Sequence, residues 1–193
     1  MNGYEILVAA HVIGVAFSVG AVTVGDMLFF RAVKQKKIDE SMVETWKIVS
    51  RIVWTGLVIL FLSGVLFFVA YRLGMPSRLP LAFTAKFWLK MTIVGVLFIN
   101  GLFMHWKAIP ILSKIVQEGG QLRSPIFQSA APVFFANGAI SLISWYAVIL
   151  LGVMRNLSLT FWQGLILYIA LLGIAIGISQ ILRRRVQYYL TKT

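Results

Sequence analysis

The chain has 193 residues, of which 60% are hydrophobic and 12% are charged, and its mean hydropathy is +0.88. Soluble domains carry about 25% charged residues, so this composition excludes a soluble domain, a disordered chain and a nucleic-acid-binding module with an accessible basic face. The sequence has no Cys, which excludes disulfide scaffolds, Cys-ligated zinc, iron–sulfur clusters and thiol catalysis. We therefore expect an integral membrane protein of one domain.

Five stretches are long and apolar enough to cross a bilayer, whose hydrocarbon core needs about 20 such residues per helix. In chain order they are residues 5–30, 46–71, 83–106, 127–153 and 159–182. These continuous runs lack the alternation of membrane barrel strands. The sequence predicts an all-α, polytopic helical bundle with five spans, forming a single domain over residues 1–193.

The basic residues are distributed unevenly between the two ends of this predicted bundle. The first and third connections and the C-terminal tail, with their flanks, hold 13 of the 18 Lys and Arg residues. Because cytoplasmic loops carry the excess of positive charge, we expect the N-terminus outside and the C-terminus in the cytoplasm of a multi-pass cytoplasmic (inner) membrane protein. The net charge of +12 then serves topology and contact with the lipid bilayer, not nucleic acid.

Two ionisable residues are expected at one depth in the outer half of the bundle. His11 lies about six residues into the first span and Lys90 about seven into the third, so both are roughly 10 Å below their helix starts. His11 is interpreted as a haem or metal ligand, a hydrogen-bonded neutral imidazole or a proton relay. Lys90 is interpreted as a second ligand, as a partner for an anionic cofactor group, or as a side chain whose charged end extends outward to the lipid headgroups.

The inner half contains a second polar layer. Asp26 and Arg51 lie at matching depths on consecutive spans, which predicts an ion pair that is either structural or part of a gate. The other polar candidates are Asn100, His105, Ser141, Ser144 and Trp145. His105 is interpreted as an interfacial anchor, and Trp145 as a packing residue or part of a cofactor cleft. Because the two histidines lie in opposite halves, a site that uses both is excluded.

The first span carries a polar face and a strip of small residues. His11, Ser18 and Asp26 lie within about 60° of one another on a helix, so this face is expected to point into the bundle. The adjoining small residues are Gly14, Ser18, Ala21 and Gly25. They predict either close helix packing or the lining of a channel.

Two motifs resemble those of a group of bacterial membrane bundles. The first is Ala10-His11-Val12-Ile13-Gly14 with Gly20 and a closing Asp26-Met27-Leu28-Phe29-Phe30-Arg31, and the second is Trp88-Leu89-Lys90. They resemble the copper-resistance-D-like proteins and the small membrane protoporphyrinogen oxidase. The resemblance implies a haem-b-associated bundle in which His11 and Lys90 are the carried-over positions. Asn100-Gly101 and a later His105 depart from the oxidase pattern, so the porphyrinogen reaction is not carried over.

The sequence leaves three functions open. The first is a haem b protein of membrane redox chemistry or electron transfer, with a site formed by His11, Lys90, Ser18 and Trp145. The second is a small transporter with Asp26, Arg51, Asn100 and His105 as an inner gate. The third is a non-catalytic subunit of a membrane complex. Its partners would be other membrane subunits, and a homo-oligomer is a further expectation.

Overall fold

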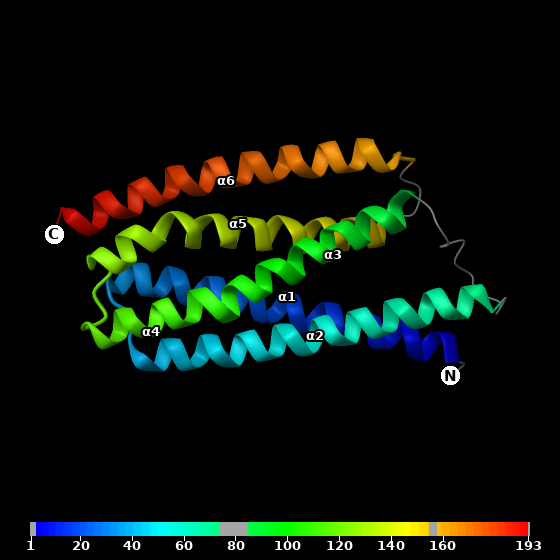
Figure 1. The fold of residues 1–193 in the computed structure, drawn as a ribbon, viewed down its shortest axis with the longest axis horizontal. Coiled ribbons are helices and arrows are strands. Elements are labelled where there is room, and N and C mark those ends of the chain that lie inside the picture. The colour runs from blue at the N-terminus through cyan, green and yellow to red at the C-terminus, as the bar shows by residue number, and fades with distance from the viewer. Residues whose placement is uncertain (1–2, 74–84, 155–157, 193) are drawn as a thin grey trace.

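The computed structural model describes residues 3–73, 85–154 and 158–192, and these form a bundle of long helices (Figure 1). The elements are α1 (Gly3–Gln35), α2 (Glu40–Arg72), α3 (Ala85–Phe103), the π-helical turn η1 (Met104–Ala108), α4 (Ile109–Gln117), α5 (Pro125–Val153) and α6 (Phe161–Thr191). Because α3, η1 and α4 are continuous, the described residues contain 5 helices long and apolar enough to cross a membrane. The predicted all-α class is confirmed, and the described residues contain as many helices of sufficient length and hydropathy as the sequence predicted spans.

The helices extend further than the apolar stretches that predicted them. The first helix covers 33 residues, about 50 Å, and the third continues to Gln117 where the sequence predicted an end at residue 106. A hydrocarbon core is about 30 Å thick, so part of each helix lies beyond it. The predicted start of the third span at residue 83, and the predicted connections at residues 74–78 and 155–156, lie outside the described residues.

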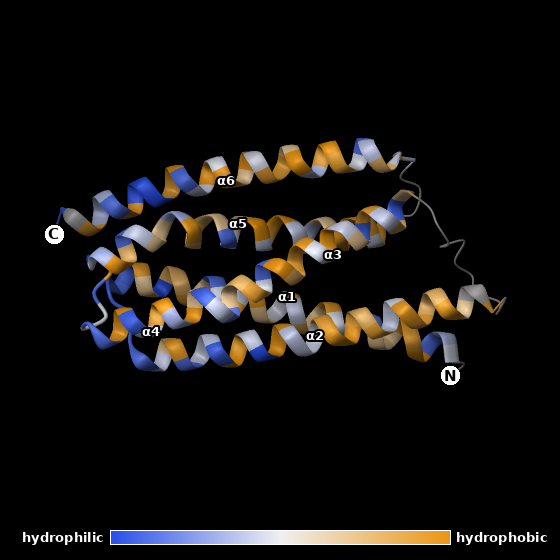
Figure 2. Cartoon of the chain, viewed as in Figure 1, coloured by the Kyte–Doolittle hydropathy of each residue, from blue (hydrophilic) through white to orange (hydrophobic). Residues whose placement is uncertain are grey.

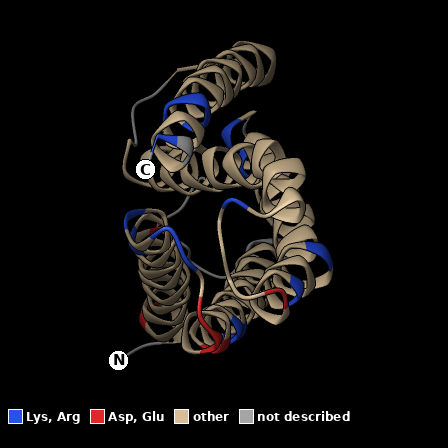
Figure 3. Ribbon diagram, turned by 90° about the vertical axis from the view of Figure 1, so that its left-hand side faces the viewer, with Lys and Arg blue, Asp and Glu red and all other residues tan. Residues whose placement is uncertain are grey.

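The two ends of the bundle differ in polarity. The N- and C-termini lie at opposite ends, and hydrophilic residues are concentrated at the end that holds the C-terminus (Figure 2). Figure 3 views this end, where several Lys and Arg positions surround the helix ends. We call it the basic end. The apolar middle of every helix lies between this end and the opposite one.

The small-residue strip of α1 packs against α2. A Cβ atom added at Gly56 would lie 2.1 Å from the Ser18 hydroxyl oxygen and 2.8 Å from the Gly14 carbonyl oxygen. Ser18 is fully buried at this crossing. Because Gly14 and Gly56 have no side chain, the backbones of α1 and α2 can approach closely. The structure agrees with the packing interpretation of Gly14 and Ser18.

The largest apolar cluster lies at the basic end and is called the basic-end cluster. It contains Ala32, Val33, Ile38, Met42, Val43, Trp46, Leu112, Ile115, Leu122, Phe127, Ala131 and Leu190. The connections at residues 36–39 and 118–124 hold its edge together, because Ile38 N–H donates to the Gly120 carbonyl at 2.8 Å. The sequence suggests an interfacial position for Trp46, but its side chain is 2% exposed and belongs to this core. The cluster closes the basic end of the bundle.

Polar side chains attach α6 to α5 near the same end. Gln187 donates to the Gln128 side-chain oxygen at 2.7 Å, and Gln180 donates to the Pro132 carbonyl at 2.9 Å. Arg183 donates to the side-chain oxygens of Gln180 and Gln187, each at 2.8 Å. Such bonds stabilise helix association where apolar surface is already solvated by lipid.

The π turn has a cause in the sequence. Pro110 has no N–H, and its ring conflicts with the carbonyl four residues earlier in a regular helix. In η1 the Ile109 N–H bonds to the Met104 carbonyl, five residues back, which is the wide π spacing. The wider turn accommodates Pro110 without ending the span.

Candidate functional site

A cavity of about 480 Å³ lies between two groups of helices. One group is the tightly packed pair α1 and α2, and the other contains α3, α5 and α6. The basic-end cluster closes one side of the cavity. A second apolar cluster, with Leu57, Leu60, Leu97 and Trp145 at its core, lies on the other side. Each candidate span contributes to the lining, so the cavity lies inside the bundle.

Each of the five candidate spans contributes at least one polar side chain to the lining. These side chains are Asp26, Ser50, Asn100, Asn137, Ser141 and Ser179. Ser179 donates to the Ile176 carbonyl at 2.8 Å, and Ser50 lies 3.5 Å from Nδ1 of His105. The other four side chains have no hydrogen-bond partner in the described part of the chain. No fully buried polar side-chain atom there is left unpaired, so these four groups face open space in the cavity.

Aromatic rings form much of the remaining wall. They are Phe29, Phe30, Trp46, Trp54, Phe134, Phe135 and Trp145. Phe29 and Phe135 meet edge to face at 5.2 Å between ring centroids, which joins α1 to α5. Within the described residues, no Lys, Arg or His lines this cavity. The lining therefore combines ring faces with a single ionisable group, the carboxyl of Asp26.

The structure has no ion pair between Asp26 and Arg51 within its described residues. Lys47 and Glu44, 2.6 Å apart, form the only ion pair within residues 3–73, 85–154 and 158–192. The buried face of α2 follows Trp46, Ser50, Leu57 and Leu60 at helical spacing. Position 51 is turned by about 100° from position 50, so the arginine lies outside this face. The two residues share a depth but not a direction.

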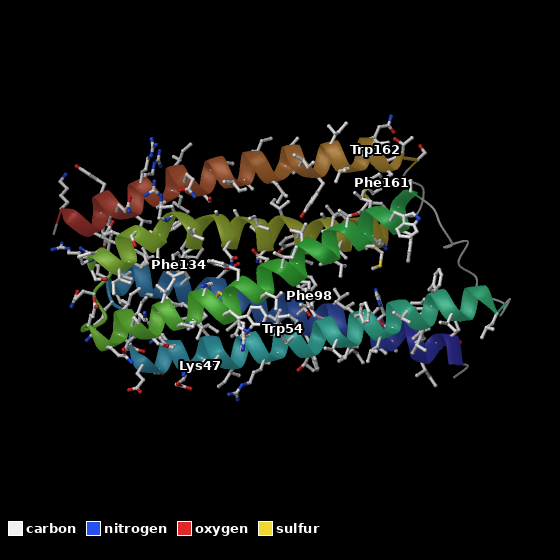
Figure 4. The ribbon with its side chains drawn as sticks, viewed as in Figure 1. Lys47, Trp54, Phe98, Phe134, Phe161 and Trp162 are labelled. Carbon is white, nitrogen blue, oxygen red and sulfur yellow. The ribbon has the colours of Figure 1, made fainter. Side chains whose placement is uncertain are left out.

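Arg51 and His105 instead line a separate surface pocket on the α2–α3 side. Both residues are exposed, and the Trp54 ring belongs to the linings of this pocket and of the cavity. Trp54 packs edge to face against Phe98 of α3 at 5.1 Å, and the two labelled rings face one another in Figure 4. The Trp54–Phe98 pair is thus a wall between the cavity and the outer surface.

His11 has a defined hydrogen-bond partner on α2. Its Nδ1 lies 2.8 Å from the hydroxyl oxygen of Ser63, and that hydroxyl donates its hydrogen to the Leu60 carbonyl at 3.1 Å. When the Ser63 hydroxyl donates to that carbonyl, it accepts from Nδ1–H of neutral His11, which leaves the Nε2 lone pair free. The imidazole also packs edge to face on Phe67.

Lys90 lies on α3 and reaches toward the end of α5. A Cβ atom at Gly152 would be 3.7 Å from its Nζ, and neighbouring Lys86 donates to the Met154 carbonyl. Cations are favourable near helix C-termini, which explains both lysines at this position.

Two predicted polar residues have structural partners outside the cavity. Ser18 is buried against Gly56, and its hydroxyl lies 3.5 Å from the Val53 carbonyl. Ser144 donates to the Ile140 carbonyl at 2.6 Å and lies 2.7 Å from the Tyr168 hydroxyl. Asp26, Asn100, Ser141 and Trp145 are the predicted residues that the structure brings together in the cavity.

Asn137 is a lining residue that the sequence reasoning missed. It lies in the middle of α5, between Ala136 and Gly138, in an otherwise apolar run. Burying a carboxamide inside a span costs free energy unless it faces a partner or a cavity. This cost is the signal that could have identified Asn137 from the sequence.

Comparison with protein-family models, curated proteins and solved structures found no match to this chain. No group of three His, Asp or Glu side chains suited to a metal ion occurs in the described parts of the sequence. The two candidate functional features of the molecule are the cavity and His11.

Proposed function

We propose that this protein is a small transporter of the cytoplasmic membrane that binds an amphipathic molecule in the cavity. The observation that carries the proposal is the carboxyl of Asp26, which has no partner among the described residues and lies inside a space lined by all five candidate spans. Ionisable groups inside a membrane are costly and by default mark a ligand or proton path. A volume of about 480 Å³ is within the usual range of small-molecule sites.

The charge distribution supports an orientation with the N-terminus outside and the basic end in the cytoplasm. In this orientation the basic-end cluster closes the cytoplasmic side of the cavity. The α1–α2 pair is tightly packed within itself, and so is the α3–α5–α6 group. The lining includes the exposed side chains of Phe30, Leu142 and Ile178, so the cavity can be reached from the outer surface of α1, α5 and α6. Trp54 and Phe98 form its wall on the α2–α3 side. A homo-oligomer or other membrane subunits remain expected partners alongside the bilayer.

We expect Asp26→Asn to reduce compound-dependent proton movement at least tenfold, because the amide cannot exchange a proton. The measurement uses proteoliposomes loaded with a pH-sensitive dye and a panel of amphipathic cations, anions and neutral compounds. Glu44→Gln is the matched control, since it removes one exposed carboxylate from α2 and should leave the rate within twofold. If no compound moves protons faster than in protein-free liposomes, the transport proposal is wrong.

A haem protein is the second candidate, and the free Nε2 of His11 favours it. Histidine ligands commonly donate Nδ1–H to a neighbouring group and bind iron through Nε2, and the Ser63 hydroxyl is placed to accept such a bond from His11. Bound haem supplies one-electron chemistry. In this candidate His11 holds the iron, and Lys90 neutralises an anionic group of the cofactor. Neither His11 nor Lys90 lines the cavity, so a haem site at these two residues is separate from the cavity.

This candidate predicts a Soret band in protein purified from haem-supplied cells, and its loss in His11→Phe. The aromatic replacement keeps the packing on Phe67 and removes the nitrogen ligand. His105→Phe, at an exposed position, should leave the band unchanged. Wild-type protein without Soret absorbance would eliminate the haem candidate, and the transport proposal does not depend on it.

A further inference from the structure

The basic residues near the cavity are directed away from Asp26. Arg51 and His105 lie behind the Trp54 ring, in the other pocket. Lys47 is paired with Glu44, and Arg183 is bound to Gln180 and Gln187. None of these groups neutralises the Asp26 carboxylate. A carboxylate in this environment needs a bound cation or a proton, because an isolated charge is poorly solvated there.

The aromatic wall offers ring surface and few hydrogen-bond donors. Trp46 donates its Nε1–H to the Gly25 carbonyl at 3.2 Å, so its donor is already occupied. Trp54 packs on Phe98 and lies 3.6 Å from the Cβ position of Gly101. The faces of aromatic rings carry negative potential and attract cations, most strongly when water is excluded.

The described lining has no positively charged side chain that could bind an anionic ligand. Anions are bound by Arg, Lys or clustered N–H donors, and the described lining has no basic side chain. Its free donors are the amides of Asn100 and Asn137 and the hydroxyl of Ser141, whose oxygens can equally accept from a cation. A single carboxyl matches a single positive charge.

We infer that the cavity binds lipophilic, monovalent organic cations, with Asp26 as counter-ion and the aromatic rings as its wall. The inference rests on the proposed transport function and names its substrate class. The carboxyl holds either the cation or a proton, so one charge is exchanged for the other at this site. When the ligand binds, its apolar groups leave the lipid and contact the aromatic rings of the cavity wall.

Binding of tetraphenylphosphonium tests the inference, because tetraphenylborate has nearly the same shape and the opposite charge. We expect saturable binding of the phosphonium to the purified full chain, and no saturable binding of the borate. Asp26→Asn should weaken phosphonium binding at least tenfold while its thermal unfolding stays near that of the wild type. Glu44→Gln should remain within twofold of wild type.

Because the chain has no Cys, a single introduced thiol can locate the binding. Ser141→Cys lies in the lining and should react with N-ethylmaleimide more slowly when phosphonium is present. Ser144→Cys, one turn later and facing Tyr168, should show no such protection. Neutral triphenylphosphine oxide is the third probe. If it protects Ser141→Cys as well as the phosphonium does, or if the borate does, the cation inference is overturned but a binding cavity stands. If no probe protects the thiol, both the inference and the transport proposal fail.

Discussion

Gly56→Ala is expected to lower the unfolding free energy by about 3 kcal/mol, the largest effect of any single methyl group in the α1–α2 pair. The new Cβ would lie 2.1 Å from the Ser18 hydroxyl oxygen and 2.8 Å from the Gly14 carbonyl oxygen. Ser18 can rotate its side chain, but a backbone carbonyl cannot move away on its own. The two helices must therefore separate along their crossing. Thermal unfolding in detergent, followed by circular dichroism, measures the change.

Gly64→Ala is the control for this substitution. Gly64 lies on the same helix two turns later, and no heavy atom lies within 4 Å of its Cβ position. Alanine is the better helix former by about 1 kcal/mol, so this variant should unfold at or slightly above the wild-type temperature. Equal unfolding temperatures for the two variants would contradict the close α1–α2 crossing.

Gly120→Ala is expected to cost a similar amount, about 3 kcal/mol, at the basic end. Gly120 has a φ of +76°, and its Cβ position lies 2.1 Å from the Ile38 carbonyl oxygen. The substitution combines a left-handed backbone with a clash at the bridge between two connections. Release of this bridge exposes Ile38, so limited proteolysis should cleave the variant within residues 36–39 or 118–124 faster than the wild type.

Gly119→Ala separates the two causes. Gly119 has a φ of +95°, but nothing lies within 4 Å of its Cβ position. It should lose only the backbone contribution, about 1–2 kcal/mol, and should resist the protease better than Gly120→Ala. If both variants lose equal stability, the bridge to Ile38 contributes nothing measurable.

The fold was predictable because hydrocarbon imposes a simple requirement on the backbone. Each apolar run must satisfy its own amides, so hydropathy alone identifies the helices. Hydropathy does not mark where a helix ends once it leaves the lipid. The segment from Lys107 to Gln117 continues the third helix in the structure, with Leu112 and Ile115 packed in the basic-end cluster. Its polar residues made the same segment resemble a connection.

The candidate site was only partly predictable. Asp26, Asn100 and Ser141, three of the predicted polar residues, line one cavity, whereas Arg51, expected beside Asp26, lines the surface pocket. Helix rotation decides between these outcomes, and rotation depends on packing partners that a single sequence does not specify. His11 was identified as important, but its tautomer depends on Ser63, which lies 52 residues away.

The π turn also sets the helical phase of the third span. A turn that closes on the fifth residue contains one residue more than an α-turn, equivalent to about 100° of rotation. Met104 and Ala108, the first and last residues of the turn, line the cavity, and Ile115 beyond it is fully buried in the basic-end cluster. One deleted residue between positions 104 and 108 would leave the span long enough for the bilayer and point its final turns in a different direction. The spacing along this helix is therefore constrained as strictly as the identity of the residues on either side.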